Sequence, residues 1–178
     1  MPRLAVSGAG YIFEPLETHH DRTTFDCGVP VLNDFIKTKA RKERDLGYSA
    51  VRIMVDPRHP TVIAGYYTLS AHSIELTDLS EALRKKLPRY PLVPTILLGR
   101  LACALAVQKA GAGERMLMDA LSTAEKTSGR VGAHAVVVDA IDDRAAAFYR
   151  KYGFVPIVGQ DRRLFLQMAT IRTLGLDE

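Results

Sequence analysis

The chain has 178 residues, of which 47% are hydrophobic and 25% charged, so its composition is that of an ordinary globular protein and excludes intrinsic disorder. One domain spanning residues 1–178 is expected, since domains average roughly 100–200 residues. A domain of this length buries on the order of 70% of its unfolded surface and needs no disulfide or metal for stability. The formal net charge of +4 favours an anionic partner without identifying one.

The cysteines and the apolar segments bound the cellular context. Cys27 and Cys103 lie far apart in the sequence and form no C-x-x-C pair, so neither a disulfide framework nor a zinc site is predicted. No apolar stretch approaches the ~18 residues that cross a bilayer, and the apolar run near the start is too short for a signal peptide. We therefore expect a cytoplasmic protein in a reducing compartment, with no membrane contact.

Positive charge gathers in two segments. Residues 82–113 contain six basic side chains and no acidic one, and residues 37–44 form a second basic cluster that only Glu43 and the following Asp45 dilute. A solvated helix face is the alternative explanation for either cluster, especially for residues 37–44. Two clusters of one sign nevertheless favour a surface for a polyanion.

The first half of the chain predicts a helix followed by a hairpin. Apolar residues at helical spacing indicate an amphipathic helix that has Pro30 in its first turn. A β-branched segment and the turn residues after it indicate a strand and its hairpin partner. The expected elements are, in order, a helix over 31–46, a strand over 50–55, a turn over 56–60, a strand over 61–71, and a short helix over 79–87 that begins at a Thr77 or Asp78 cap and ends before Pro88.

The second half alternates strands and helices. Residues 95–107 are too uniformly apolar for a surface strand and predict a central strand that is buried on both faces, with Arg100 as its exception. The elements expected next are a glycine loop over 108–113, a helix over 114–127, a strand over 133–139, a helix over 143–151 that is capped by Asp142 or Asp143 and ended by Gly153, and strands over 154–158 and 164–168 that pair across the turn 159–163. This order predicts an α/β fold, a mixed sheet with helices on both faces.

The glycine loop is the segment that indicates chemistry. Gln108-x-x-Gly111-x-Gly113 stands between a buried strand and a helix. A helix N-terminus presents unpaired N–H groups, and glycines let the backbone approach closely, so such a loop suits a pyrophosphate. The spacing is neither the G-x-G-x-x-G of a dinucleotide fold nor a P-loop. A tight strand-to-helix turn without a ligand is the alternative.

These segments carry a family resemblance. Gln108-x-x-Gly-x-Gly113 is similar to the acetyl-CoA signature of GCN5-related N-acetyltransferases (GNAT), and residues 139–154 resemble that family's later strand and helix. Phe25-Asp-Cys-Gly-Val29, Gly65-Tyr-Tyr-Thr-Leu69 and Leu97-Leu-Gly-Arg-Leu-Ala102 further resemble the acetyltransferase toxins of bacterial toxin–antitoxin modules, over roughly residues 25–168. The chain departs from that branch in having Cys103-Ala104 where its members have Val-Asp.

The resemblance implies an activity. A member of this branch transfers an acetyl group from acetyl-CoA to the α-amino group of an aminoacyl-tRNA, blocks translation, and is neutralised by a cognate antitoxin. The family commonly forms homodimers. Two alternatives stay open: a GNAT enzyme that acts on a protein or small-molecule amine, and a non-catalytic module that binds CoA or nucleic acid.

Site residues follow from the same resemblance. Tyr149, favoured over Tyr152, is expected to protonate the departing CoA thiolate; the alternative is an aromatic side chain packed in the core. No catalytic base is demanded, because an α-amino group with a pKa near 8 is partly neutral at pH 7. The cofactor is expected to contact Leu101, Ala102, Cys103, Gln108, Lys109, Ala110, Gly111, Ala112, Gly113, Glu114, Arg115 and Phe148.

The tRNA is expected to contact basic residues from both clusters. The candidates are Lys37, Arg41, Lys85, Lys86, Arg89 and Arg100. For Arg100 the alternative is an internal ion pair, because a cation in a buried strand is costly when unpaired. The histidines show no metal-ligand spacing, so no metal is expected, and His134 is expected to be a hydrogen-bonded core residue. Both cysteines are expected to be packing residues.

Overall fold

The computed structural model describes residues 10–108 and 111–176, which divide into two compact units. Unit 1 comprises the described residues up to Ser70 together with Arg100–Ala120, and unit 2 comprises Ala71–Gly99 and the described residues from Leu121 onward. Strands β3 (Gly65–Glu75) and β4 (Leu92–Cys103) and helix α4 (Ala112–Ser128) pass through both. Within the described part of the chain, seven strands form one mixed sheet in the order β1-β2-β3-β4-β5-β7-β6, which confirms the predicted α/β class.

Unit 1 contains the expected hairpin. β2 (Ala50–Val55) coincides with its predicted range and pairs antiparallel with β3 and with an unpredicted strand, β1 (Ile12–Pro15). β3 begins at Gly65 rather than at the predicted Thr61. The residues before Gly65 pair elsewhere, because the Asp21 N–H donates to the Thr61 carbonyl and Asp21 bridges to Val62.

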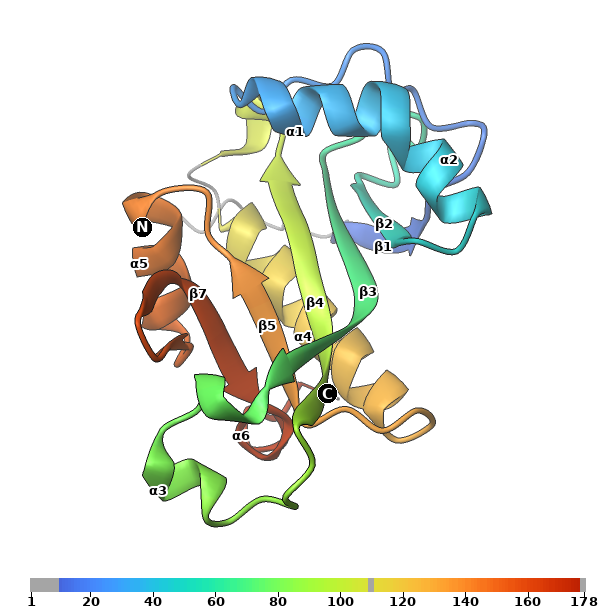
Figure 1. Cartoon of the computed structure of the whole chain (residues 1–178). Coiled ribbons are helices and arrows are strands. Elements are labelled where there is room, and N and C mark those ends of the chain that lie inside the picture. The colour runs from blue at the N-terminus through green and yellow to red at the C-terminus, as the bar shows by residue number, and fades with distance from the viewer. Residues whose placement is uncertain (1–9, 109–110, 177–178) are drawn as a thin grey trace. The chain divides into compact units, whose positions relative to one another are not determined.

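The predicted helix over 31–46 is present in three segments (Figure 1). These are α1 (Pro30–Asp34), the π-helical turn η1 (Phe35–Lys39) and α2 (Ala40–Asp45). Pro30 occupies the first turn, where its missing N–H costs nothing. Leu32, Phe35, Ile36 and Ala40 are buried in the core of unit 1, as their spacing predicts.

Unit 2 contains the strands and the helix that were predicted for the last part of the chain. β4 pairs parallel with β5 (Ala135–Asp139), and β5 lies beside the antiparallel β7 (Gln160–Gln167) (Figure 1). β7 also pairs antiparallel with β6 (Val155–Ile157). α5 (Asp143–Lys151) keeps its predicted bounds: the Asp142 carboxylate caps it by accepting from the Ala145 N–H at 2.7 Å, and Gly153 (φ +97°) follows its end. The short helix α6 (Met168–Arg172) was not predicted.

Several predicted boundaries are wrong for local reasons. The turn predicted over 159–163 is largely the first half of β7, which begins at Gln160 after Gly159 (φ +78°) and pairs with β5 as far as Arg163, and Met168 belongs to α6 rather than to this strand. In place of one helix over 79–87, the chain forms the 3-10 turn η2 (Leu76–Asp78) and helix α3 (Glu81–Arg84). Ser80 is the cap, because the Asp78 carboxylate instead accepts from the Glu75 N–H. The strand predicted over 95–107 ends at Cys103, and Leu105–Val107 forms the 3-10 turn η3. The helix predicted from Glu114 begins at Ala112. No helix in the described ranges is both long and apolar enough to cross a membrane.

Candidate active site

The glycine loop leads directly into α4. Gly111 has φ +76°, a left-handed conformation that strains other residues, and a Cβ there would meet open space. Ala112, Gly113, Glu114 and Arg115 form the first turn of α4, and the Arg115 N–H already bonds to the Gly111 carbonyl at 3.1 Å. First-turn amides of a helix lack intrahelical partners, so this turn can receive an anion. Of the predicted cofactor residues, Lys109 and Ala110 lie outside the described residues.

The Gln108 side chain clamps the start of this loop. Its Nε2 donates to two backbone carbonyls, those of Cys27 and Cys103, both at 2.9 Å. The Leu105 N–H also donates to the Asp26 carbonyl at 2.9 Å. The motif Phe25–Val29 is therefore bound to the end of β4 and to η3, immediately before the glycines.

An aspartate holds the Phe25–Val29 segment in turn. Asp26 Oδ1 accepts from the Gly28 N–H at 2.8 Å and from Asn33 Nδ2 at 2.9 Å, while Asn33 Oδ1 accepts from the Cys27 N–H at 2.8 Å. These bonds, the Gly28 amide first, lower the pKa of Asp26. The sequence analysis missed Asp26 and Asn33. The Asp-x-Gly pattern of an Asx turn was the available signal.

The end of β4 extends beyond its pairing with β5. The β4–β5 register covers Thr95–Leu98, whereas β4 continues to Cys103 and includes the predicted cofactor residues Leu101, Ala102 and Cys103. Cys27 and Cys103 are free thiols, and burial raises the pKa of Cys103 to about 12 and that of Cys27 also above its usual value. Neither is a thiolate at neutral pH, which agrees with the packing role predicted for them.

Aromatic rings fix Tyr149 on α5. Its side chain is buried, and its ring meets those of Phe148 and Phe154 edge to face, with centroids 5.3 and 5.5 Å apart. Phe148 also packs against Tyr152 at 5.2 Å. The core packing considered as an alternative for Tyr149 is thus present, and it holds the phenol in one orientation.

Arg100 has structural partners within unit 1. Its guanidinium carbon lies 3.6 Å from the centroid of the Phe35 ring, and Nη1 lies 3.9 Å from a Glu43 carboxylate oxygen. The internal ion pair expected as an alternative for Arg100 is therefore observed, and a cation–π contact accompanies it.

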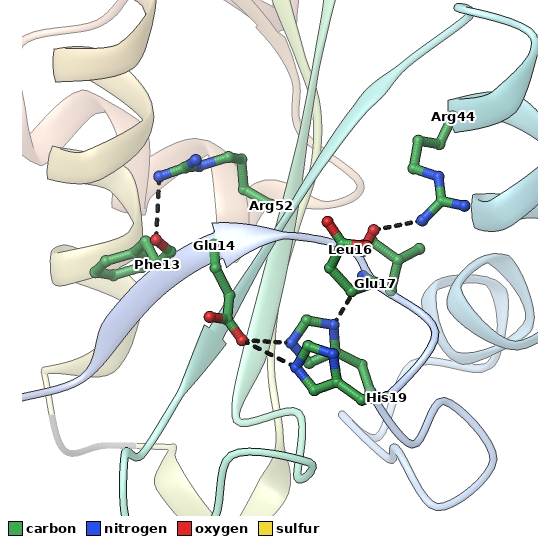
Figure 2. Close-up of polar contacts among 8 residues, drawn as sticks. Phe13, Glu14, Leu16, Glu17, His19, Arg44 and Arg52 are labelled. Atoms are coloured by element: carbon green, nitrogen blue, oxygen red, sulfur yellow. Dashed lines mark hydrogen bonds and ion pairs between the residues drawn. The ribbon is translucent and has the colours of Figure 1, made fainter.

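Two predicted tRNA residues share a hollow in unit 1. Lys37 and Arg41 line a space of about 170 Å³ together with Arg22 and Arg44. The Arg22 guanidinium donates to the Lys37 carbonyl at 3.2 Å, and that of Arg44 donates to the Leu16 carbonyl (Figure 2). Glu17 and Asp21 also line this space, but Arg22, Lys37 and Arg41 form no ion pair with them or with another described residue, so these three cations can face an anion.

The predicted tRNA residues of unit 2 differ in their pairing. Lys85 forms an ion pair with Glu81 at 3.3 Å, one helical turn earlier. Lys86 and Arg89 are exposed and have no ion-pair partner in the described ranges. Arg89 lines a second hollow, which also contains Tyr90.

Glu14 lies beside His19 (Figure 2), and with His20 they form a cluster that the spacing of the histidines in the sequence did not predict. Their potential ligand atoms lie within 4.8 Å of one another. However, His20 Nδ1 accepts from the Glu17 N–H at 2.9 Å, so Nε2 carries the proton and donates to Glu14 at 2.7 Å. A metal needs the lone pair of that nitrogen, so the hydrogen bonds favour a His–Glu pair. This pair lowers the pKa of Glu14.

Two further histidines, His134 and His72, have structural partners too. In unit 2, Gln167 Nε2 donates to His134 Nε2 at 3.1 Å, as expected of a hydrogen-bonded residue, and burial lowers the pKa of His134. His72 lies between Arg163 and Thr95, at 3.2 and 3.3 Å. Burial and the Arg163 charge lower the pKa of His72, so both rings are neutral at pH 7.

Comparison with known proteins finds related toxins, although no protein-family model matches the chain. The chain is 30% identical to a probable toxin TacT of Sinorhizobium fredii (strain NBRC 101917 / NGR234) over 171 residues, which cover 92% of this chain and 94% of that protein. It is 32% identical to a tRNA-acetylating toxin of Mycobacterium tuberculosis (strain ATCC 25618 / H37Rv) over 154 residues, covering 86% and 90%.

Solved structures of toxins also match this chain. A tyrosine-to-phenylalanine mutant of KacT matches with a TM-score of 0.87 and 31% identity, covering 92% of this chain and 98% of that one. AtaT complexed with acetyl-methionyl-tRNAfMet matches with a TM-score of 0.84, the same identity and the same coverage. The structure of AtaTR bound with acetyl-CoA matches with a TM-score of 0.79 and 32% identity, covering 92% and 97%.

Proposed function

This chain belongs to the family of GNAT acetyltransferase toxins that acetylate tRNA, and on that premise we propose how its residues serve the reaction. The protein is an N-acetyltransferase that uses acetyl-CoA to acetylate the α-amino group of an aminoacyl-tRNA, and a cognate antitoxin neutralises it. The observation that carries this function is the match, over 92% of the chain, to AtaT complexed with acetyl-methionyl-tRNAfMet. Blocked elongation would make the activity inhibitory to translation.

The cofactor would be held mainly by backbone. The first-turn amides of α4 from Ala112 to Glu114, with the preceding Gly111, would bind the pyrophosphate of acetyl-CoA, whereas the Arg115 N–H is already bonded to the Gly111 carbonyl. The amides of the pantetheine arm would pair with β4 at Leu101–Cys103, beyond the four residues in register with β5. Gln108 supports this assignment indirectly, since its side chain fixes the chain between these two segments.

Tyr149 would act as the acid. The neutral α-amino nitrogen attacks the acetyl carbonyl carbon, a C–N bond forms, and the C–S bond breaks. The departing thiolate takes the phenolic proton of Tyr149, and the phenolate regains a proton that the nitrogen loses. The aromatic contacts of Tyr149 with Phe148 and Phe154 support this role, because a side chain that is already packed loses little conformational entropy when it orients its hydroxyl for proton transfer.

The tRNA would be held by cations. Lys37 and Arg41 in the unit 1 hollow, and Lys86 and Arg89 in unit 2, carry charges without ion-pair partners among the described residues and suit phosphates. Lys85 and Arg100 contribute less, since each already faces a carboxylate. We further propose a single-domain protein that forms a homodimer, which would present each basic surface twice.

The deciding experiment compares acceptors. The purified protein is incubated with labelled acetyl-CoA and total charged tRNA, and in parallel with the same tRNA after deacylation. Label on the charged tRNA alone is expected and would establish the α-amino group as the acceptor. If both samples remain unlabelled while the protein still binds acetyl-CoA, the aminoacyl-tRNA assignment falls, and a protein or small-molecule amine becomes the acceptor to seek.

A further inference from the structure

Unit 2 presents an exposed aromatic ring within a hollow that the mechanism above does not use. Tyr90 is 71% exposed and lies in the segment between α3 and β4 (Figure 1). It lines an open hollow of about 460 Å³ with Leu76, Arg89, Pro91 and Leu92. Leu92 is itself 55% exposed, so the hollow is lined by an aromatic ring, an accessible aliphatic side chain and a cation.

The segment restrains the backbone that carries this ring and leaves the side chain exposed. Pro88 and Pro91 flank Tyr90 and restrict the backbone. The Leu76 N–H donates to the Pro91 carbonyl at 2.9 Å, which ties the two sides of the hollow together. Leu76 and Leu87 pack onto the apolar core of unit 2 beneath it. A ligand that contacts Tyr90 would therefore meet a backbone that is already ordered, and its binding would have to order only the exposed ring.

The charges around the hollow indicate the ligand's chemistry. Arg89 lines it, and Lys86 lies nearby in the sequence; both cations lack ion-pair partners in the described ranges. The single carboxylate in the lining, Glu75, caps η2 and accepts from the Thr77 hydroxyl at 3.4 Å, and its remaining lone pairs can accept from the exocyclic amino group of a base. Cations for a phosphate chain beside an aromatic platform are the features that bind single-stranded nucleic acid.

We propose that the hollow of unit 2 is a base-stacking site, in which the ring of Tyr90 receives an unpaired base from the single-stranded 3′ end of the tRNA. This assignment rests on the proposed function, which supplies a substrate that ends in unpaired nucleotides. Arg89 contacts the adjoining phosphate.

A matched tyrosine makes the test selective. Tyr48 is 72% exposed and also follows a basic segment, but it lines neither of the two hollows described. Tyr90→Ala, Tyr90→Phe and Tyr48→Ala are compared for binding to uncharged tRNA and to the same tRNA trimmed of its 3′ single-stranded nucleotides. Stacking on one base corresponds to a loss of about 5- to 150-fold on truncation to alanine. We expect that loss for Tyr90→Ala on intact tRNA alone, and none for the other two variants.

Other results would overturn the assignment. One is equal binding of intact tRNA by Tyr90→Ala and wild type; another is a loss that is the same for intact and trimmed tRNA. If Tyr90→Ala keeps tRNA binding but weakens the antitoxin complex, the hollow is a protein-docking surface instead. Acetylation of charged tRNA by the wild type, measured in parallel, separates the two hypotheses: active wild type with unaffected Tyr90→Ala rejects only the stacking site, whereas inactive wild type rejects the proposed function.

Discussion

The glycine loop of unit 1 and helix α5 of unit 2 place their functional groups by different means. Around the loop, the side chains of Gln108, Asp26 and Asn33 bind backbone groups, and the candidate ligand contacts are themselves backbone amides. On α5 the proposed functional group is one side chain, Tyr149, and the rings of Phe148 and Phe154 pack against it. The loop should therefore be sensitive to backbone conformation and local charge, and α5 to the loss of a single hydroxyl.

The largest effect is expected at that hydroxyl. Tyr149→Phe keeps the ring contacts and removes the acid, so kcat should fall by about 10²–10⁴. The Kd for acetyl-CoA should stay unchanged, because the loop of unit 1 is intact. Turnover by single-turnover assay and affinity by calorimetry check both expectations. Tyr152→Phe is the control and should retain most activity; wild-type turnover by Tyr149→Phe would remove it as the acid.

The second-largest effect is expected when a negative charge is introduced at the glycine loop. Gly111→Asp places a carboxylate next to the proposed pyrophosphate site, and like charges about 4 Å apart repel by ~1–4 kcal/mol, or roughly 5- to 1,000-fold in Kd. Gly111→Asn is the control, since asparagine tolerates the φ of +76° and adds no charge. A weaker Kd for acetyl-CoA in the aspartate variant, relative to the asparagine variant, is expected. Equal affinities would move the pyrophosphate elsewhere.

Loss of the Gln108 clamp should weaken acetyl-CoA binding by less than the charge at Gly111 does. Gln108→Ala removes two hydrogen bonds worth about 1 kcal/mol each. The expected result is a rise in KM for acetyl-CoA of roughly 10-fold, with kcat little changed. Gln108→Glu should be worse than alanine, because its carboxylate faces the carbonyls of Cys27 and Cys103. Steady-state kinetics on the wild type, Gln108→Ala and Gln108→Glu provide the check. An equal KM for acetyl-CoA in all three would show that Gln108 does not support the cofactor site.

The smallest effect concerns acid stability. Asp26 has a lowered pKa in the folded state, so its ionised form stabilises the fold above the unfolded value near 3.9, and this contribution is lost as the pH falls through the lowered pKa. Asp26→Asn keeps the acceptor but cannot titrate. Below about pH 4 the Tm of the wild type should therefore fall more steeply than that of Asp26→Asn. Parallel Tm curves from pH 6 to 2 would show that another carboxylate dominates.

The sequence was informative where a signal is local. The helical spacing of Leu32, Phe35, Ile36 and Ala40 correctly gave the buried face of the first helical segment, and the Asp142 cap and Gly153 gave both ends of α5. It failed where distant residues compete for the same backbone groups. Leu105 looks like a continuation of β4, yet its N–H bonds to Asp26, far earlier in the chain. No periodicity encodes that bond.

The amino-acid sequence by itself determined the α/β class, the order of most elements, the glycine loop and the family motifs, because these depend on side-chain periodicity, turn chemistry and short spacings. The tertiary structure alone decided what each polar group binds. It bound Gln108 to the carbonyls of Cys27 and Cys103, placed Arg100 over the Phe35 ring, and brought the Arg22 guanidinium to the Lys37 carbonyl. Hydrogen bonds, ion pairs and burial depend on distances between residues far apart in the chain, and only folding sets those distances.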